Sequence, residues 1–269
     1  MKRKFSLLAL TLFIASILLS GCGSTKQAAS DTSLQDIKSK GKFVVGLDDS
    51  FPPMGFRDEN NNIVGFDIDL AKEVAKRMGV QVEFKPVQWD GIIMSLNNKD
   101  IDVIWNGLTI TEKRQQEIAF SKVYLENKQI IVTKADSAIK TKKDLTGKVV
   151  GLQLGSSSET ALNADTATAK SLKEIKKFNT NTEALLDLKN GRVDAVVIDE
   201  VVGRYYAAKT PNVYTVLNED LGKESYGVGF RKTDVTFKNE VDKVLDEMKA
   251  DGTADKISQQ WFGKSIITK

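Results

Sequence analysis

Residues 96–104 (LNNKDIDVI) and 188–196 (LKNGRVDAV) decide the fold expected for this chain. In both stretches the end of a helix leads through a polar turn into a strand that opens with an apolar residue, an aspartate and a second apolar residue. This weak internal repeat predicts two similar lobes. The alternative is that two unrelated strand–helix–strand units resemble each other this closely by chance.

Short apolar runs alternate with amphipathic stretches on either side of the repeat. Residues 43–47, 80–84, 101–105 and 148–154 have the composition of buried strands, whereas residues 67–78 place their apolar side chains on one helical face. This alternation is typical of strand–helix–strand units, so it predicts an α/β fold with mostly parallel sheets.

The repeated strands also locate the expected ligand site. One strand ends at Asn106-Gly107 and the other at Ile198-Asp199. In an open α/β sheet the ligand lies beyond the carboxyl ends of the strands. We therefore expect these two strand ends to face each other across a cleft between the lobes.

The N-terminal residues have the layout of a secretory signal. A basic head at residues 2–4 precedes an apolar run at residues 5–19, which is too short to cross a hydrocarbon core of about 30 Å as a permanent helix. Leu19-Ser20-Gly21-Cys22 resembles a bacterial lipobox, whose cysteine is lipidated and becomes the new N-terminus. We expect residues 1–21 to be a signal peptide and residues 22–36 a tether that carries lipid, including palmitate, on Cys22.

The composition excludes several classes of function. Removing the three basic residues of the signal from the 39 in the chain leaves 36, which equals the 36 acidic residues. Nucleic-acid binders need a basic footprint, so no nucleic-acid partner is expected. Histidine is absent, which excludes His-dependent nucleophilic catalysis and His-ligated metal sites. With the sole cysteine assigned to lipid, we expect no metal and no cofactor.

Two segments that lead from a strand into a helix could bind an anion. Residues 106–114 (NGLTITEKR) leave a buried strand and place Arg114 in the first turn of a helix. Arg114 is either a solvated helix charge or a binding residue. Residues 155–159 (GSSSE) follow another strand, and Ser156 with Glu159 matches a capping box. The same segment could instead offer the free amides of a helix N-terminus to an anion.

Three further side chains occupy positions that suit a ligand site. Asp199 ends an apolar strand, where an isolated carboxylate is costly unless it meets water or a cation. Phe51 lies on a loop that Pro52 and Pro53 make rigid, and Trp89 begins a helix expected over residues 89–96. Each of the two aromatic residues is either core or a platform for a ligand.

Together these segments resemble the amino-acid-binding proteins of bacterial ABC importers, the polar amino acid branch of the extracellular solute-binding proteins. The resemblance covers residues 34–262, and its specific pieces are residues 48–53, 65–70, 109–114, 155–157 and 194–200. It implies an α/β, two-lobe periplasmic-binding fold of the second type with a hinge between the lobes. Lobe 1 would be discontinuous, with residues 37–127 plus 228–269, and lobe 2 would span residues 128–227.

The resemblance also implies a set of ligand-binding residues: Asp48, Phe51, Trp89, Asn106, Gly107, Thr109, Arg114, Gln153, Ser156, Ser157 and Asp199. Arg114 would clamp the α-carboxylate of the ligand, and Asp199 would receive its α-ammonium. Phe51 and Trp89 would sandwich the ligand side chain. Some relatives carry lysine where this chain has Gln153, which leaves the identity of that side chain open. The same holds for Asn106, where serine or alanine is common.

The expected function is that of a substrate-binding lipoprotein of an amino acid ABC importer. A polar amino acid, either basic or neutral and including cystine, would bind by hinge closure and pass to a permease that an ATPase drives. The protein would be a monomer and not an enzyme, anchored on the extracellular face of the cell membrane by its lipid alone. One alternative is a lyase or dehydratase on the same scaffold, with Asp48, Asp199 or Glu200 as its acid or base. The other is an amino acid sensor without transport.

Overall fold

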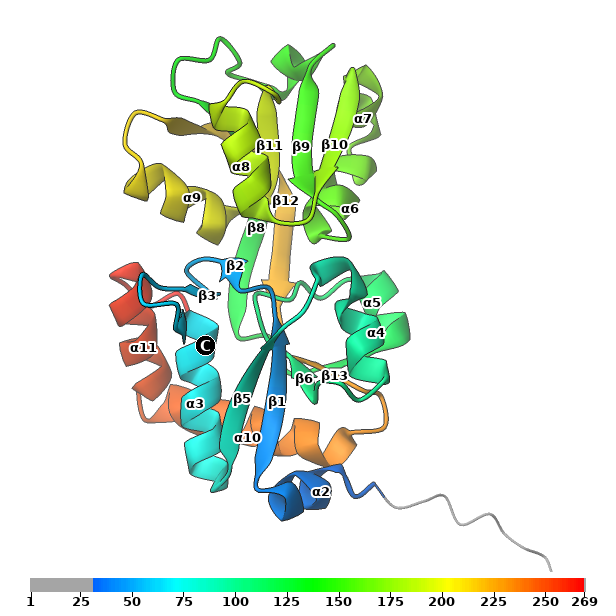
Figure 1. Cartoon of the computed structure of the whole chain (residues 1–269), viewed down its shortest axis with the longest axis vertical. Coiled ribbons are helices and arrows are strands. Elements are labelled where there is room, and N and C mark those ends of the chain that lie inside the picture. Colours follow the sequence, from blue (N-terminus) through cyan, green and yellow to red (C-terminus); the bar gives the residue numbers. More distant parts are fainter. Residues whose placement is uncertain (1–30, 269) are drawn as a thin grey trace, which may run out of the picture. The chain divides into compact units, whose positions relative to one another are not determined.

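The computed structural model describes residues 31–268. The expected signal peptide of residues 1–21, Cys22 and most of the expected tether lie outside the described residues. From Thr32 onward the chain builds two five-stranded sheets and one three-stranded sheet, with helices packed against them (Figure 1). We call residues 33–120 together with residues 229–268 lobe 1, and residues 125–226 lobe 2. Residues 33–36, expected as the end of the tether, form the first turn of a helix in lobe 1.

The two large sheets share one topology. The sheet of lobe 1 has the strand order β5-β1-β6-β13-β7, and the sheet of lobe 2 has the order β10-β9-β11-β8-β12. The strands of lobe 1 are β1 (Lys42–Leu47), β5 (Gln81–Pro86), β6 (Val103–Ile104), β7 (Ala119–Phe120) and β13 (Gly229–Phe230). Those of lobe 2 are β8 (Leu125–Lys134), β9 (Val149–Gln153), β10 (Glu174–Phe178), β11 (Ala195–Asp199) and β12 (Tyr214–Tyr226). The small sheet consists of β2 (Ser50–Phe51), β3 (Gly55–Arg57) and β4 (Ile63–Val64).

Both large sheets are mixed, but in each of them four of the five strands run in one direction, so the expectation of mostly parallel sheets holds except for one strand per sheet. The first three strands in each order pair in parallel, and the remaining two pairings are antiparallel. The exceptions are β8 in the second sheet and β13, by which the chain returns to the first sheet. In Figure 1, β8 and β12 extend between the two large sheets in opposite directions. No helix separates β8 or β13 from the strand before it in the chain, so the periodicity of alternating strands and helices did not reveal the direction of these two strands.

The internal repeat is confirmed, and its aspartates explain it. The repeat strands β6 and β11 are the middle strands of their sheets. The amide of Asp102 donates to Val44 O at 2.8 Å, and its carboxylate accepts from Val44 N at 2.9 Å. Asp194 makes the same reciprocal pair with Val149, at 2.8 Å in both directions. Each aspartate thus extends the strand pairing by one residue with its side chain.

The helices cover the sheets through apolar faces. In lobe 1 they are α2 (Ser33–Lys40), α3 (Phe66–Met78), α4 (Ile92–Asn97), α5 (Glu112–Glu117), α10 (Val235–Ala250) and α11 (Thr253–Phe262). In lobe 2 they are α6 (Ser157–Ala164), α7 (Thr166–Ser171), α8 (Asn181–Lys189) and α9 (Glu200–Lys209). Short 3-10 turns span Trp89–Gly91 and Lys142–Leu145. The helix expected over residues 89–96 therefore begins as a 3-10 turn and becomes α-helical only at Ile92.

Successive residues of β1 serve opposite faces of the first sheet, as a strand of period two requires. Phe43 packs against Phe237 of α10, with 5.5 Å between ring centroids. Val44 packs instead with the cluster that contains Ile92 of α4 and Ile101. Because both faces are covered, residues 43–47 of β1 contain no polar side chain, and the strand was recognised from the sequence for that reason.

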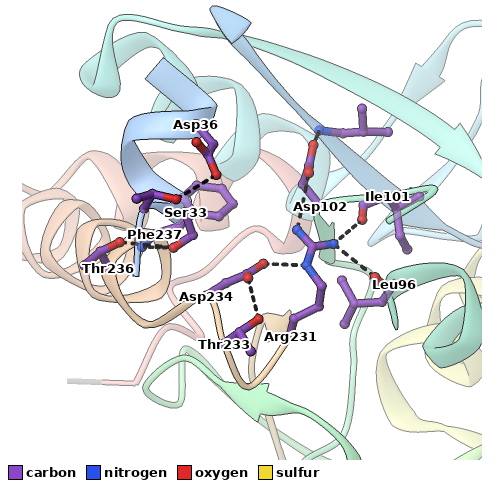
Figure 2. Close-up of polar contacts among 12 residues, drawn as sticks. Ser33, Asp36, Leu96, Ile101, Asp102, Arg231, Thr233, Asp234, Thr236 and Phe237 are labelled. Atoms are coloured by element: carbon purple, nitrogen blue, oxygen red, sulfur yellow. Dashed lines mark hydrogen bonds and ion pairs between the residues drawn. The ribbon is translucent and has the colours of Figure 1, made fainter. Parts of the chain in front are cut away.

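A polar network around Arg231 connects the end of β13 to the segment that leads into β6 (Figure 2). The guanidinium donates to the carbonyl oxygens of Leu96 at 3.0 Å and Ile101 at 2.7 Å. It also forms ion pairs with Asp234 at 2.6 Å and with Asp102, the repeat aspartate, at 3.4 Å. Arg231 follows β13 directly, so these contacts fix where that strand enters the sheet.

Both β8 and β12 are fastened to lobe 1 at one end. Leu125, the first residue of β8, pairs with Tyr226, the last residue of β12. Beyond this pair, Tyr226 bridges to Thr109 and Leu125 bridges to Ile267 of lobe 1. The two strands thus join the lobes as an antiparallel ribbon. Among the described residues, no helix is long and apolar enough to span a bilayer.

Candidate functional site

Arg114 is buried between the lobes. Thr111 caps α5 by accepting a hydrogen bond from the amide of Arg114 at 3.2 Å, which sets the first turn of the helix. The guanidinium donates to Thr109 O at 2.9 Å and, across the cleft, to Gly155 O at 3.2 Å. Arg114 is 9% exposed, so the alternative of a solvated helix charge is excluded.

The charge of Arg114 is only partly compensated. None of the ion pairs within residues 31–268 includes it. Burial lowers the pKa of its guanidinium, and the negative fields of Glu224 and then Asp199 act against that shift. A buried cation without a carboxylate in contact is costly, so this position suits a ligand that brings an anion.

Asp199 ends β11 and collects hydrogen bonds from both ribbon strands. Its Oδ1 accepts from Asn127 Nδ2 at 2.9 Å, from Gln129 Nε2 at 3.0 Å and from the hydroxyl of Tyr226 at 2.6 Å. Burial raises the pKa of Asp199 well above its usual value, and the neighbouring Glu224 raises it further. This carboxyl group is therefore poised to gain from the approach of a cation.

Two aromatic rings form parallel walls in lobe 1. The ring centroids of Phe51 and Trp89 are 6.5 Å apart, and the ring planes differ by only 4°. Both residues are buried, and the guanidinium carbon of Arg114 lies 5.7 Å from the Trp89 ring centroid. The sequence left core and platform as alternatives for each ring. Their parallel arrangement beside Arg114 favours the platform.

Asp48 lies at the start of the loop that carries Phe51. Its Oδ1 accepts from the amide of Ser50 at 2.9 Å and from the hydroxyl of Ser50 at 2.6 Å. Its Oδ2 accepts from Gln153 Nε2 of lobe 2 at 2.7 Å. Burial raises the pKa of Asp48, although the hydrogen bonds from Ser50 and Gln153 oppose that shift. Asn106 accepts from the Asp48 amide at 3.1 Å and so holds the start of the loop.

The Asn106-Gly107 turn is held in place by a hydrogen bond to a buried carboxyl group. Gly107 has φ of 61°, and a Cβ there would lie 2.9 Å from Cε1 of Phe51, so no larger residue fits without a shift. Oδ2 of Asp67 on α3 accepts from the Gly107 amide at 2.7 Å and from the Tyr124 hydroxyl at 2.9 Å. Burial raises the pKa of Asp67 to about 7. Asp67 thus positions the turn next to the ring of Phe51.

The GSSSE segment forms the N-terminus of α6 and faces lobe 1. Ser156 accepts from the Glu159 amide at 3.4 Å and donates to Gln153 O at 2.7 Å. The reciprocal half of the expected capping box is different, because Glu159 accepts from the amide of Gly155 rather than from that of Ser156. Ser157 accepts across the cleft from the hydroxyl of Thr109 at 3.0 Å.

All eleven expected ligand-binding residues lie in one connected region between the lobes. Direct contacts join Asp48 to Gln153 and Thr109 to Ser157 across the cleft, and Gln129 links Ser157 to Asp199. A groove of about 620 Å³ runs along one edge of this region and is lined by residues that include Trp89, Arg114, Gly155 and Ser156. Whether these residues hold a ligand stays a prediction at this point. Within residues 31–268 no cluster of acidic or cysteine side chains could hold a metal ion.

Several residues at the site were not identified from the sequence: Asp67, Asn127, Gln129, Glu224 and Tyr226. Asn127 and Gln129 are buried amide side chains of β8, and the strand continues after them with apolar residues 130–132. Two buried amide side chains in an apolar strand need polar partners, which is the signal that could have found them. Glu224 carries no such signal, because only the antiparallel pairing of β12 with β8 brings it to Asn127.

Comparison with known proteins places these features in a family. The sequence model for bacterial extracellular solute-binding proteins, family 3, matches residues 43–264. The L-cystine-binding protein TcyJ of Escherichia coli (strain K12) is 32% identical over 90% of this chain and 91% of its own length. A substrate-binding protein of an ABC uptake transporter from Streptococcus pneumoniae, solved with bound histidine, has a TM-score of 0.86 and 38% identity, covering 89% of this chain and 99% of that one.

A reconstructed protein is also similar. An ancestral arginine-binding protein solved with arginine has a TM-score of 0.78 and 47% identity, covering 83% of this chain and 99% of that one. The expected α/β, two-lobe fold is confirmed by these structural matches. The relatives named here are binding proteins rather than enzymes. The chain belongs to family 3 of the bacterial extracellular solute-binding proteins.

Proposed function

We propose that this protein captures a cationic amino acid, arginine foremost, between its two lobes and delivers it to a membrane permease. The observation that carries the proposal is the opposition of charges along the cleft. The positive guanidinium of Arg114 has no carboxylate in contact. Asp199 lies near enough for its negative field to stabilise the charge of Arg114. An amino acid has an anion and a cation on one carbon, so it matches such a pair better than a simple acid or amine does.

The other part of the cleft supports a cationic side chain. Phe51 and Trp89 present parallel faces, and a planar cation beside an aromatic face gains about 0.5–2 kcal/mol. Asp48 lies on the same loop as Phe51, and burial disfavours its ionised form until a positive partner arrives. Relatives that bind arginine and histidine support this choice of ligand class.

Acidic ligands fit less well. Aspartate or glutamate would bring a second carboxylate toward Asp48, and the residue that reaches Asp48 from lobe 2 is the neutral Gln153. Like charges at close range in a buried site are unfavourable. Neutral polar ligands, glutamine and cystine among them, remain acceptable because they add no charge. We therefore expect the order basic, then neutral polar, then acidic.

Import and membrane anchoring are the further parts of the proposal. The family match and the transporter-derived relative support a permease and its ATPase as partners. Cys22 within Leu19-Ser20-Gly21-Cys22 supports lipid attachment on the extracellular face of the cell membrane. We propose a monomer, because the ligand site is assembled from the two lobes of a single chain.

An enzyme on the same scaffold is a weaker candidate. Of its three candidate acids and bases, Glu200 forms ion pairs with Arg204 at 2.6 Å and Lys128 at 3.8 Å. Asp48 and Asp199 accept hydrogen bonds that fix their orientation, which suits binding as well as catalysis. Recovery of the amino acid unchanged after prolonged incubation would distinguish binding from turnover.

Calorimetric titration of the secreted chain, without its signal peptide, against the twenty amino acids and cystine tests the function. We expect a single site per chain, with arginine binding most tightly. In a thermal-shift assay, a ligand at 100 times its dissociation constant adds about 2.7 kcal/mol to the free energy of unfolding. A larger shift with glutamate than with arginine, lysine, glutamine and cystine would overturn the assigned charge preference. Absence of binding to any of them would overturn the function.

A further inference from the structure

Glu224 lies beside Asp199, and the roles implied by family resemblance leave it unassigned. It projects from β12, while Asp199 ends β11 and the two share no strand pairing. Oε1 of Glu224 accepts from Asn127 Nδ2 at 2.6 Å and from Gln129 Nε2 at 2.9 Å. Oδ1 of Asp199 accepts from the same two nitrogens. Two carboxyl oxygens are thus neighbours that share one set of donors.

The contacts of these two amides outnumber their hydrogens. Each side-chain amide has two N–H groups. Asn127 Nδ2 approaches two carboxyl oxygens, and Gln129 Nε2 approaches those two and the hydroxyl oxygen of Ser157 at 3.1 Å. The two amides therefore face five acceptor contacts with four hydrogens. None of the donors to Asp199 except the Tyr226 hydroxyl serves Asp199 alone, and none of them carries a positive charge. An ammonium group would bring three donors together with a positive charge.

The charges around the pair lead to the same conclusion. Among the carboxylates near Arg114, Glu224 stabilises the positive charge most, followed by Asp199. Asp199 feels Glu224 as a like charge, which adds to the effect of burial in raising the pKa of Asp199. A cation between the two carboxyl groups would relieve this repulsion. The same cation would lie close to Arg114, where the proposed function places the ligand carboxylate.

We infer that Glu224 is the second carboxylate of the ammonium subsite and holds the ligand α-ammonium together with Asp199. This inference rests on the proposed function and makes it more specific. A site with two carboxyl groups favours a primary α-ammonium, because a ligand without it brings no positive charge to either of them. Discrimination against des-amino and N-acylated acids should therefore depend on Glu224.

This subsite lies on the two-stranded ribbon of β8 and β12 that joins the lobes. Asn127 and Gln129 belong to β8, and Glu224 belongs to β12, so the ammonium would bind directly over the two strands that join the lobes. Asp199 contributes from the sheet of lobe 2, and Tyr226, which donates to Asp199 at 2.6 Å, pairs with Thr109 of lobe 1. The α-ammonium would therefore contact the ribbon as well as the lobes.

The test compares Glu224→Gln with the wild type on two ligands. One ligand is the amino acid that the wild type binds most tightly, and the other is the same molecule without its α-amino group. For arginine the second ligand is δ-guanidinovaleric acid, and for glutamine it is glutaramic acid. The matched control is Glu126→Gln, which makes the same change at an exposed position of β8 whose carboxylate accepts from Ser225 Oγ at 3.1 Å. Glu224→Asp keeps the charge and tests for partial rescue.

We expect Glu224→Gln to weaken binding of the amino acid at least about tenfold, because the variant loses one charge-assisted hydrogen bond to the ammonium. It should leave the affinity for the des-amino ligand unchanged or increase it, because one uncompensated anion has been removed. Glu126→Gln should change neither. Equal loss for both ligands would show that Glu224 only orients Asn127 and Gln129, and unchanged binding of both would remove it from the site. Either result overturns the inference alone. A wild type that binds no amino acid overturns the proposed function, and the inference with it.

Discussion

Gln153 of lobe 2 donates a hydrogen bond to the carboxylate of Asp48 in lobe 1, with 2.7 Å between Nε2 and Oδ2. The same Nε2 also donates to Asn179 O at 3.0 Å, and Oε1 of Gln153 accepts from Asn181 at 3.1 Å. Gln153 is therefore held on three sides and offers a fixed donor to Asp48. A lysine at this position would form an ion pair with Asp48 and cancel its charge, so Gln153 is what keeps Asp48 available to a cationic ligand.

Substituting Asp48→Asn should reduce the preference for basic ligands. Asparagine keeps the size of the side chain but removes the charge that a guanidinium or ammonium would meet. We expect the affinity for arginine to fall by about tenfold or more, while the affinity for glutamine changes far less. Calorimetry with both ligands measures the ratio. Asp49→Asn on the same loop, where Asp49 pairs with Arg57 instead, is the control and should preserve the ratio.

Arg114→Ala should abolish amino acid binding in a protein that still folds. Removing one partner of a buried charge-assisted pair costs about 2–5 kcal/mol of binding free energy. Lys113→Ala changes the exposed neighbour on the same helix and should bind normally. Circular dichroism verifies the fold, and titration measures the affinity. Near-wild-type affinity in Arg114→Ala would exclude Arg114 from the site.

Asp67 should make the protein less stable as the pH rises toward neutrality. Its pKa is raised from 3.8 to about 7 in the fold, so between these values the folded state holds a proton that the unfolded state has released. The free energy of unfolding therefore falls across that range, and the stabilisation is lost as the pH passes about 7. Buried Asp48 and Asp199 act in the same direction.

Asp67→Asn should remove the part of this slope that Asp67 causes. Urea unfolding at several pH values from about 5 to about 8 would measure it. The control is Asp69→Asn on the same helix, whose carboxylate is partly exposed and accepts from Trp261 Nε1 at 2.9 Å. An identical slope in Asp67→Asn and in the wild type would contradict the assignment.

Cys22→Ser should release the protein from the membrane or leave it unprocessed. The lipobox has a single cysteine, and serine offers no thiol for the lipid. Membrane and soluble fractions of cells that express the variant give the measurement, with the wild type fractionated in parallel. Labelling of the variant by radioactive palmitate would show that another residue carries the lipid.

Much of the fold was predictable because its signals are local. The apolar strands β1 and β9 and the amphipathic α3 were recognised from period and composition, and the repeat aspartates gave the two lobes. The direction of β8 and β13 was not, because antiparallel strands without a preceding helix carry no signal of their own. The break at Trp89–Gly91 was also missed, since a 3-10 turn and an α-helix share apolar spacing over so few residues.

Site residues could be predicted where the residue type and its position at the end of a strand or helix indicate the function. They could not be predicted where the role depends on which residue lies beside them in the fold. Arg114 and Asp199 stand at strand and helix ends, which are visible in the sequence. Asp67 lay inside a recognised motif, but its contact with the Gly107 amide depends on packing across forty positions of the chain. Glu224 reaches Asp199 only through the register of β12 against β8, which no local pattern encodes.

The position of β13 also determines the order in which the chain can fold. Gly229 pairs with Ile104 on one side and Phe120 on the other, so the first sheet is incomplete until residues 229–230 arrive. The second sheet comes from the continuous segment 125–226 and needs no later strand. During synthesis or export, lobe 2 can therefore complete its sheet while lobe 1 still exposes the edge of β6. The lobe that begins first along the chain is the last to be finished.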